Sequence, residues 1–160
     1  VFFRQERIGQ GNRRFRIWKF RSMLASKADP TGKVSTNRND DRISRVGRFI
    51  RRTSIDELPQ LFNVLSGDMS LIGPRPHALG SLAGQQLFWE VDPRYWLRHS
   101  MRPGITGLAQ VRGYRGATDV PADLENRLRS DLEYVSNWSI FLDFRILLAT
   151  CKVVIHDKAY

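Results

Sequence analysis

The sequence predicts an α+β fold, a mostly helical single domain that opens with a small N-terminal β-hairpin. Residues 1–8 and 13–20 are rich in aromatic and β-branched side chains and flank the tetrapeptide Gly9-Gln10-Gly11-Asn12, a pattern typical of two strands joined by a turn. Later segments repeat apolar residues at helical spacing instead. A length of 160 residues suits one domain covering residues 1–160.

A basic helix is predicted between residues 42 and 52. Its apolar side chains recur at helical spacing and arginines fill the other positions, with Ile43, Val46, Phe49 and Ile50 set against Arg42, Arg45, Arg48, Arg51 and Arg52. Asp40 or Asp41 is expected to cap the first turn. The helix therefore presents a strongly positive face.

An adjacent pair of carboxylates, Asp56 and Glu57, follows this helix. Ser54 and Glu57 match a capping box, so a second helix is expected to begin at Ser54 and to end before Gly67. Because a proline clashes deep inside a helix, Pro59 leaves open a start at Asp56 instead. In both registers the helix start and the nearby arginines favour ionised carboxylates.

Ionised carboxylates beside arginines suit phosphate chemistry. An Asp in this setting is a poor general acid, but it can attack phosphorus or bind a metal. The loop Gly73-Pro74-Arg75-Pro76 then holds one arginine between two prolines that fix the backbone. Helix capping with surface ion pairs is the alternative interpretation of the acidic pair taken alone. With the arginines and the loop included, residues 40–76 are interpreted as a phosphate-handling active site.

The other segments predict connecting structure and two more helices. Residues 24–39 are expected to form a mobile polar loop, and residues 69–72 a short strand. One face of the next helix carries Leu124, Leu128, Leu132 and Val135, and the opposite face carries Glu125, Arg127, Arg129 and Glu133. Residues 138–156 form a helix too charged to cross a bilayer, which belongs to the core or to a membrane interface. Cys151 in this helix is expected to be buried.

Positive charge is concentrated in the first part of the chain. The net charge is +10, and residues 1–60 hold 15 Lys or Arg against 6 Asp or Glu, so an anionic partner is expected there. Residues 15–21, FRIWKFR, interleave bases with aromatic side chains, which also suits a nucleic-acid-binding module. That function is the main alternative, although it does not explain the acidic pair. A peripheral membrane scaffold is a third hypothesis.

Metal, disulfide and common nucleotide motifs are absent from the sequence. His77, His99 and His156 lack metal-ligand spacing, and one cysteine builds neither a zinc site nor an internal disulfide. The chain contains no Walker loop and no GxGxxG fingerprint. A bound nucleotide must therefore be held in another way.

Four motifs resemble those of a known family. They are KFRSM at Lys19–Met23, DRISRVGRFIRRTSIDELPQLFNVLSGDMSLIGPRP at Asp41–Pro76, RPGITGLAQV at Arg102–Val111 and YRGATD at Tyr114–Asp119. The chain resembles the bacterial sugar transferases, the monotopic polyprenyl-phosphate phosphoglycosyl transferases. The later motifs are similar to the hexose-1-phosphate branch that starts exopolysaccharide synthesis.

The resemblance implies an activity and its partners. A sugar 1-phosphate, of glucose or galactose, would pass from a UDP-sugar to undecaprenyl (polyprenyl) phosphate, giving a polyprenyl-diphosphate-sugar and UMP, with Mg²⁺ as cofactor and no nucleic acid. Family members carry a hydrophobic helical hairpin upstream, so the chain resembles a catalytic domain without its membrane anchor. The full-length protein is expected on the cytoplasmic face of the bacterial inner membrane, among its lipids, and the fragment alone soluble or peripherally bound. The oligomeric state stays open.

The resemblance also implies roles for individual residues. Asp56 would be the nucleophile of a ping-pong reaction that passes through a covalent aspartyl phosphosugar. Glu57, with Asp56 as a second candidate, would bind magnesium. The cations expected to bind phosphate groups are Lys19, Arg21, Arg51, Arg75 and Arg102.

Overall fold

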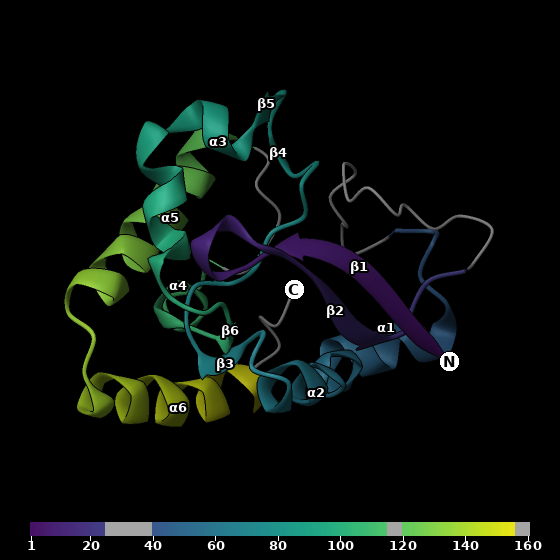
Figure 1. The fold of residues 1–160 in the computed structure, drawn as a ribbon. Helices are drawn as coiled ribbons and strands as arrows, with labels where there is room; N and C mark the ends of the chain where they lie inside the picture. The colour runs from purple at the N-terminus through teal and green to yellow at the C-terminus, as the bar shows by residue number, and fades with distance from the viewer. Residues whose placement is uncertain (25–39, 115–119, 156–160) are drawn as a thin grey trace.

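The computed structural model describes residues 1–24, 40–114 and 120–155, and it confirms the α+β prediction. Strands β1 (Phe2–Ile8) and β2 (Arg14–Phe20) form the predicted antiparallel hairpin, joined by the short 3-10 helix η1 (Gln10–Asn12). The predicted mobile loop lies outside the described residues apart from Leu24. In Figure 1 the hairpin lies above α1 and α2.

The basic helix α1 spans Arg45–Arg52. Ser44 caps it by accepting a hydrogen bond from the Gly47 amide at 2.9 Å, so the predicted cap at Asp40 or Asp41 is wrong. Asp40 is ion-paired with Arg42 instead. Gly47 is buried because its backbone packs against the Ser22 carbonyl, where a Cβ would overlap.

The acidic pair lies in a tight connection rather than at the start of a long helix. Ser54 has a left-handed φ of 57° and makes no capping bond, so the predicted capping box is wrong. The 3-10 helix η3 (Ile55–Glu57) follows, and α2 (Gln60–Leu65) begins after Pro59. The positive φ reverses the chain after α1, and Pro59 fits at a helix start but not inside one. Gly67 ends α2 as predicted, with a φ of 84°.

Two short parallel strands lie next to the Gly73-Pro74-Arg75-Pro76 loop. Strand β3 (Ser70–Ile72), in the predicted position, pairs with β6 (Gly104–Thr106). A Cβ on Gly73 or Gly104 would overlap the backbone of the other segment. Glycine is therefore required where the two backbones approach most closely.

The remaining elements pack around two apolar clusters. In chain order they are β4 (Leu82–Ala83), β5 (Gln86–Leu87), α3 (Phe88–Val91), the 3-10 helix η4 (Pro93–Ser100), α4 (Leu108–Val111), α5 (Pro121–Ser136) and α6 (Ile140–Ile155). The first cluster contains Phe88 and Leu124, and the second contains Leu108 and Ile146. On the apolar face predicted for α5, Leu124 and Leu128 are buried, and Leu132 and Val135 are partly buried.

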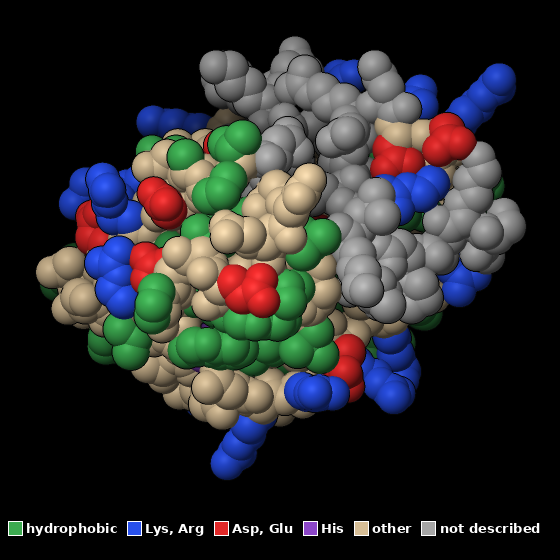
Figure 2. Space-filling view, turned by 90° about the horizontal axis from the view of Figure 1, so that it is seen from above, with side chains coloured by type: hydrophobic (Ala, Val, Ile, Leu, Met, Phe, Trp, Pro, Cys, Tyr) green, Lys and Arg blue, Asp and Glu red, His purple; other side chains and the backbone are tan. Residues whose placement is uncertain are grey.

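Helices α1, α2 and α6 line the lower edge of the molecule in Figure 1. Many of their apolar side chains face solvent, including Val46, Phe49, Phe62, Leu65, Phe141 and Leu148. Cys151 on α6 is also exposed, so its predicted burial is wrong. Figure 2 views the opposite, upper side of the molecule, where a band of apolar side chains lies near acidic and basic ones. Within the described ranges, no helix combines the length and apolar character that a bilayer span requires.

Candidate active site

The carboxylates of Asp56 and Glu57 lie inside the protein, where each residue is 7% exposed. The 3-10 helix that carries them packs against α1 and β2. Asn63 of α2 fixes this arrangement, because it accepts a hydrogen bond from the Trp18 amide at 2.9 Å and donates one to the Arg16 carbonyl at 2.9 Å. Asn63 is itself 1% exposed. The strand edge is thereby joined to the helix that follows the acidic pair.

Two of the predicted phosphate-binding cations converge on Glu57. Lys19 from β2 donates to Oε1 at 2.9 Å. Arg75 from the Gly-Pro-Arg-Pro loop donates to Oε2 at 3.1 Å through Nη1 and to Oε1 through Nη2. Burial works to lower the pKa of Arg75, but the charge of Glu57 and its hydrogen bond outweigh burial and raise it. Three segments far apart in sequence thus meet at one carboxylate.

Asp56 is in a different environment from Glu57. No described residue donates a hydrogen bond to its carboxylate, and burial raises its pKa, although Lys19 acts in the opposite direction. For Asp56 the predicted net preference for the ionised form is therefore wrong, although Arg51 and Arg75 act in the predicted direction. The single 3-10 turn offers little helix dipole, and desolvation exceeds the attraction of the nearby cations. A carboxylate with a raised pKa is more basic, which favours nucleophilic attack once it is deprotonated.

Of the other three predicted phosphate-binding cations, one lies near the acidic pair and two are exposed. The charge of Arg51 acts on Asp56 and lowers its pKa, so Arg51 belongs to the cluster. Arg21 is exposed, and its side chain is 3.5 Å from the Phe2 carbonyl. The Arg102 side chain is exposed as well, although its backbone packs against Gly73. Neither Arg21 nor Arg102 bonds to the acidic pair.

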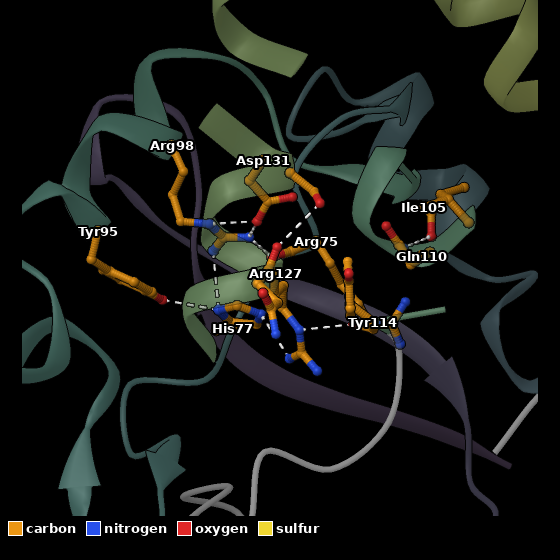
Figure 3. A network of polar contacts seen from close by, with 11 residues as sticks. Arg75, His77, Tyr95, Arg98, Ile105, Gln110, Tyr114, Arg127 and Asp131 are labelled. Atoms are coloured by element: carbon orange, nitrogen blue, oxygen red, sulfur yellow. Dashed lines mark hydrogen bonds and ion pairs between the residues drawn. The ribbon is translucent and has the colours of Figure 1, made fainter. Parts of the chain in front are cut away.

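A buried polar network supports the loop that carries Arg75 (Figure 3). Arg98 pairs with Asp131 at 2.6 Å, and both side chains are 1% exposed. The same guanidinium donates to the Arg75 carbonyl at 2.6 Å. A buried ion pair is thereby connected to the backbone of the residue that holds Glu57. The sequence prediction missed this network.

His77 lies between two arginines of this network. Its Nδ1 is 3.1 Å from Nη1 of Arg98 and 3.0 Å from the Tyr95 hydroxyl, and its Nε2 is 3.4 Å from Nη1 of Arg127. Burial, Arg98 and Arg127 lower the pKa of His77 well below 6.5. The imidazole is therefore neutral at pH 7 and accepts a hydrogen bond from Arg98, which cannot itself accept one.

Arg127 corrects the predicted pattern of α5. It was expected on the polar face, but it is 7% exposed and donates to the Tyr114 carbonyl at 2.9 Å. Leu124, Arg127, Leu128 and Asp131 follow an i, i+3, i+4, i+7 spacing, so all four share the inner face. The one sequence signal for a buried Arg127 is that Asp131, four residues further along the same face, carries the opposite charge.

An apolar cavity of about 290 Å³ opens beside Glu57. Its walls include Leu58, Leu61, Leu71, Ile105, Val111 and Leu147. These residues come from the segment around α2, from β3, β6 and α4, and from α6. The cavity therefore links the polar site to the exposed apolar side chains of α2 and α6.

The nucleic-acid interpretation of residues 15–21 gains little from the structure. Ile17 is buried, and Lys19 is engaged by Glu57. Trp18 is covered by the Arg4 guanidinium, 3.4 Å from the ring centroid. The segment is therefore not a continuous exposed surface on which bases could stack.

Comparisons with known proteins agree on one family. The chain is 52% identical over 150 residues to an exopolysaccharide production protein PSS of Rhizobium leguminosarum bv. phaseoli, covering 94% of this chain and 75% of the relative. It is 52% identical over 158 residues to an undecaprenyl-phosphate glucose phosphotransferase of Komagataeibacter xylinus. This match covers 99% of this chain and 30% of the relative. A UDP-glucose:undecaprenyl-phosphate glucose-1-phosphate transferase of Escherichia coli (strain K12) is 45% identical over 161 residues. This match covers 100% of this chain and 34% of the relative.

The chain thus spans about a third of the length of the last two relatives. Residues 1–157 match the model of the family described as bacterial sugar transferase. This match contains the acidic pair, the Arg75 loop and the buried network behind it. The chain belongs to the bacterial sugar transferase family.

Proposed function

We propose that this protein transfers a sugar 1-phosphate from a UDP-sugar to undecaprenyl phosphate and releases UMP. The observation that carries the proposal is a buried acidic pair held among cations, at the edge of an apolar cavity. The cations suit a diphosphate, and the cavity suits the hydrocarbon of a lipid acceptor. Two relatives are named as transferases that involve undecaprenyl phosphate and glucose, which supports the same reaction.

Asp56 is the proposed nucleophile. Its carboxylate oxygen attacks the phosphorus that carries the sugar, and the bond from that phosphorus to the UMP oxygen breaks. A phosphate oxygen of undecaprenyl phosphate then attacks the same phosphorus and displaces Asp56, forming the lipid diphosphate. Because no described residue donates a hydrogen bond to Asp56, its lone pairs are available for attack. Arg75 and Lys19 are suited to stabilise charge on the phosphate oxygens.

The acidic pair also fits a magnesium ion. Among the described residues, no group of three or more His, Cys, Asp or Glu side chains could hold a metal. Magnesium commonly binds through one or two carboxylates and takes its other ligands from water and substrate phosphates. Glu57 and Asp56 are the residues we assign to it. The bound ion would neutralise charge on the diphosphate.

The membrane side of the site is proposed to be the layer of α1, α2 and α6. Its most exposed apolar side chains include Leu65 at 84% and Phe141 at 78%. Such side chains stabilise an interfacial position by entering the boundary between headgroups and acyl chains. Arginines of α1 would meet anionic lipids there. We infer a location at the cytoplasmic face of the inner membrane, where the acceptor phosphate can reach Asp56.

A trapping experiment tests the reaction. The full-length protein in lipid nanodiscs receives UDP-glucose and magnesium without acceptor, and intact-mass measurement follows the protein. We expect UMP release and an added glucose phosphate on Asp56, with both lost in Asp56→Asn. Asp68→Asn is the control, since Asp68 is exposed and lies outside the pair. Unchanged turnover in Asp56→Asn would rule out the covalent step.

A panel of UDP-sugars then identifies the donor. UDP-glucose and UDP-galactose differ only in the orientation of one hydroxyl group. The rate of adduct formation in single-turnover assays reports the first displacement separately from lipid binding. We expect one of these two donors to react fastest, and equal rates for both would contradict a sugar-selective site.

A further inference from the structure

Arg7 is a second basic residue on the inner face of the hairpin, in addition to Lys19. In the hairpin register Gln5 pairs with Ile17, and Arg7 pairs with Phe15. Side chains two apart along a strand share a face, so Arg7 lies on the same face as Gln5, which is buried. This face packs against the polar site. The hairpin thus directs two cations inward from different strands.

The guanidinium of Arg7 has an incomplete set of partners. It donates to Oε1 of Gln5 at 2.5 Å, but its buried Nε has no hydrogen-bond acceptor. No carboxylate of the described residues forms an ion pair with it. Burial, with the charge of Arg75, lowers its pKa to about 10. Burying a charge without an ion-pair partner lowers the stability of the folded protein. Arg7 is therefore expected to have a function that offsets this cost.

The charges around Arg7 indicate which kind of group would bind its guanidinium. Arg75 and Lys19 already share the single carboxylate of Glu57. The charges of Glu57 and Arg75 both act on Arg7, so the three residues lie in one electrostatic environment. Asp56 acts on Lys19 and Arg75 as well, and the three cations still outnumber the two carboxylates. An anion entering the site would contact groups that are already desolvated and already oriented.

The position of Arg7 distinguishes the two ends of the substrate. Lys19 pairs with Phe3, whereas Arg7 lies four residues further along β1, towards the turn. In Figure 1 this direction leads away from α1 and α2. The lipid acceptor is proposed to arrive from the layer of α1, α2 and α6. Along the hairpin, Arg7 is therefore further than Lys19 from the side on which the acceptor is proposed to arrive.

We propose that Arg7 is a phosphate-binding residue of the active site and contacts the phosphate group that leaves as the nucleoside monophosphate. This inference rests on the proposed function. Binding supplies the anionic oxygen that the guanidinium lacks in the free protein. Arg75 and Lys19 remain beside the phosphorus that Asp56 attacks, and Arg7 holds the leaving phosphate on the far side.

Stability and nucleotide affinity should change in opposite directions when Arg7 is replaced. Arg7→Met removes the charge and keeps most of the side-chain length, so the free full-length protein should unfold at the same or a higher temperature. Its affinity for UMP should fall by roughly 10- to 100-fold, the range for losing a charged hydrogen bond. Arg7→Lys keeps the charge without the planar fork and should lie between the parent and Arg7→Met.

UMP inhibition of sugar-nucleotide turnover provides the affinity, and a thermal melt without nucleotide provides the stability. Arg14→Gln is the matched control, because Arg14 belongs to the same hairpin but is exposed, 3.5 Å from Glu6. It should leave both quantities unchanged. A large fall in melting temperature for Arg7→Met, or loss of its fold, would assign Arg7 a structural role and overturn the inference.

The outcomes separate this inference from the proposed function. A full-length parent that turns over no UDP-sugar would overturn the proposed function itself. An active parent whose Arg7→Met variant binds UMP as tightly as the parent would overturn only the role of Arg7. Weaker UMP binding at unchanged or higher melting temperature supports it.

Discussion

Arg75 donates to both carboxylate oxygens of Glu57, with Nη1 3.1 Å from Oε2. Such a two-point contact fixes the orientation of each partner as well as the distance between them. The backbone of Arg75 is fixed from the other side, because its carbonyl accepts a hydrogen bond from Arg98. The guanidinium is therefore oriented before substrate arrives.

Replacing Arg75 by Lys tests the importance of the two-point contact between the Arg75 guanidinium and Glu57. Lysine keeps the charge but cannot donate to two oxygens in a fixed plane. We expect turnover to fall by roughly 10- to 100-fold, the cost of one charged hydrogen bond. The rate of aspartyl adduct formation measures the effect. Arg129→Lys, an exposed change on α5, serves as the control, and parent-like rates in Arg75→Lys would contradict a positioning role for the fork.

The raised pKa of Asp56 predicts a pH dependence. Only the deprotonated carboxylate attacks phosphorus, so adduct formation should fall as the pH drops through a pKa above the ordinary 3.8. The pH profile of the single-turnover rate gives this pKa. A profile that stays flat down to pH 4 would contradict the raised pKa.

The same shift predicts a stability effect of Asp56→Asn. A carboxyl whose pKa is higher in the folded state than in the unfolded state binds its proton more tightly when folded. Its contribution to stability is therefore lost as the pH rises through the folded pKa. Asp56→Asn should have a higher melting temperature than the parent at pH 7, and the difference should shrink at low pH. An equal or lower melting temperature at pH 7 would be inconsistent with this linkage.

The elements with strong periodicity were predictable, whereas the buried charges were not. The hairpin, the apolar face of α5 and the glycine after α2 each have a local signal in the sequence, and the structure confirms them. Asp131 looks like an ordinary surface residue in the sequence. Its partner Arg98 is 33 residues away, so no local pattern reveals that both are buried.

Two other errors have separate physical origins. Ser54 fits a capping box by sequence, but it adopts a left-handed conformation because the chain reverses after α1. Cys151 was assigned to the core because its neighbours are apolar, yet α6 turns that face outward. Apolar neighbours in sequence do not reveal which face of a helix packs against the protein, so the burial of one residue cannot be deduced from them.

The Arg98–Asp131 ion pair gives a prediction that separates stability from activity. Arg98→Met leaves Asp131 buried without its partner and should cost about 3–5 kcal/mol of unfolding free energy. Adding Asp131→Leu removes the uncompensated charge and should restore most of that stability. Turnover should stay low in the double variant, because the Arg75 carbonyl still lacks its donor. Denaturant unfolding and turnover are measured on all three proteins, and recovery of both together would show that the pair acts only through stability.

The exposed apolar layer predicts how the chain binds membranes. Electrostatic attraction through α1 alone would be lost at high salt, because screening becomes effective within about 3 Å at 1 M ionic strength. Apolar insertion by Leu65 and Phe141 is not screened. We therefore expect residues 1–160 to sediment with anionic vesicles at low salt and to retain part of this binding at high salt.

Two sets of variants separate the contributions to vesicle binding. The pair Arg45→Gln and Arg48→Gln should weaken binding at low salt only, since both arginines are exposed on α1. The pair Leu65→Ser and Phe141→Ser should weaken it at every salt concentration. Leu97→Ser is the matched apolar control, because Leu97 is 59% exposed but belongs to η4, outside the layer. If Leu97→Ser weakens vesicle binding as much as the α2 and α6 variants do, the membrane-facing surface cannot be the layer of α1, α2 and α6.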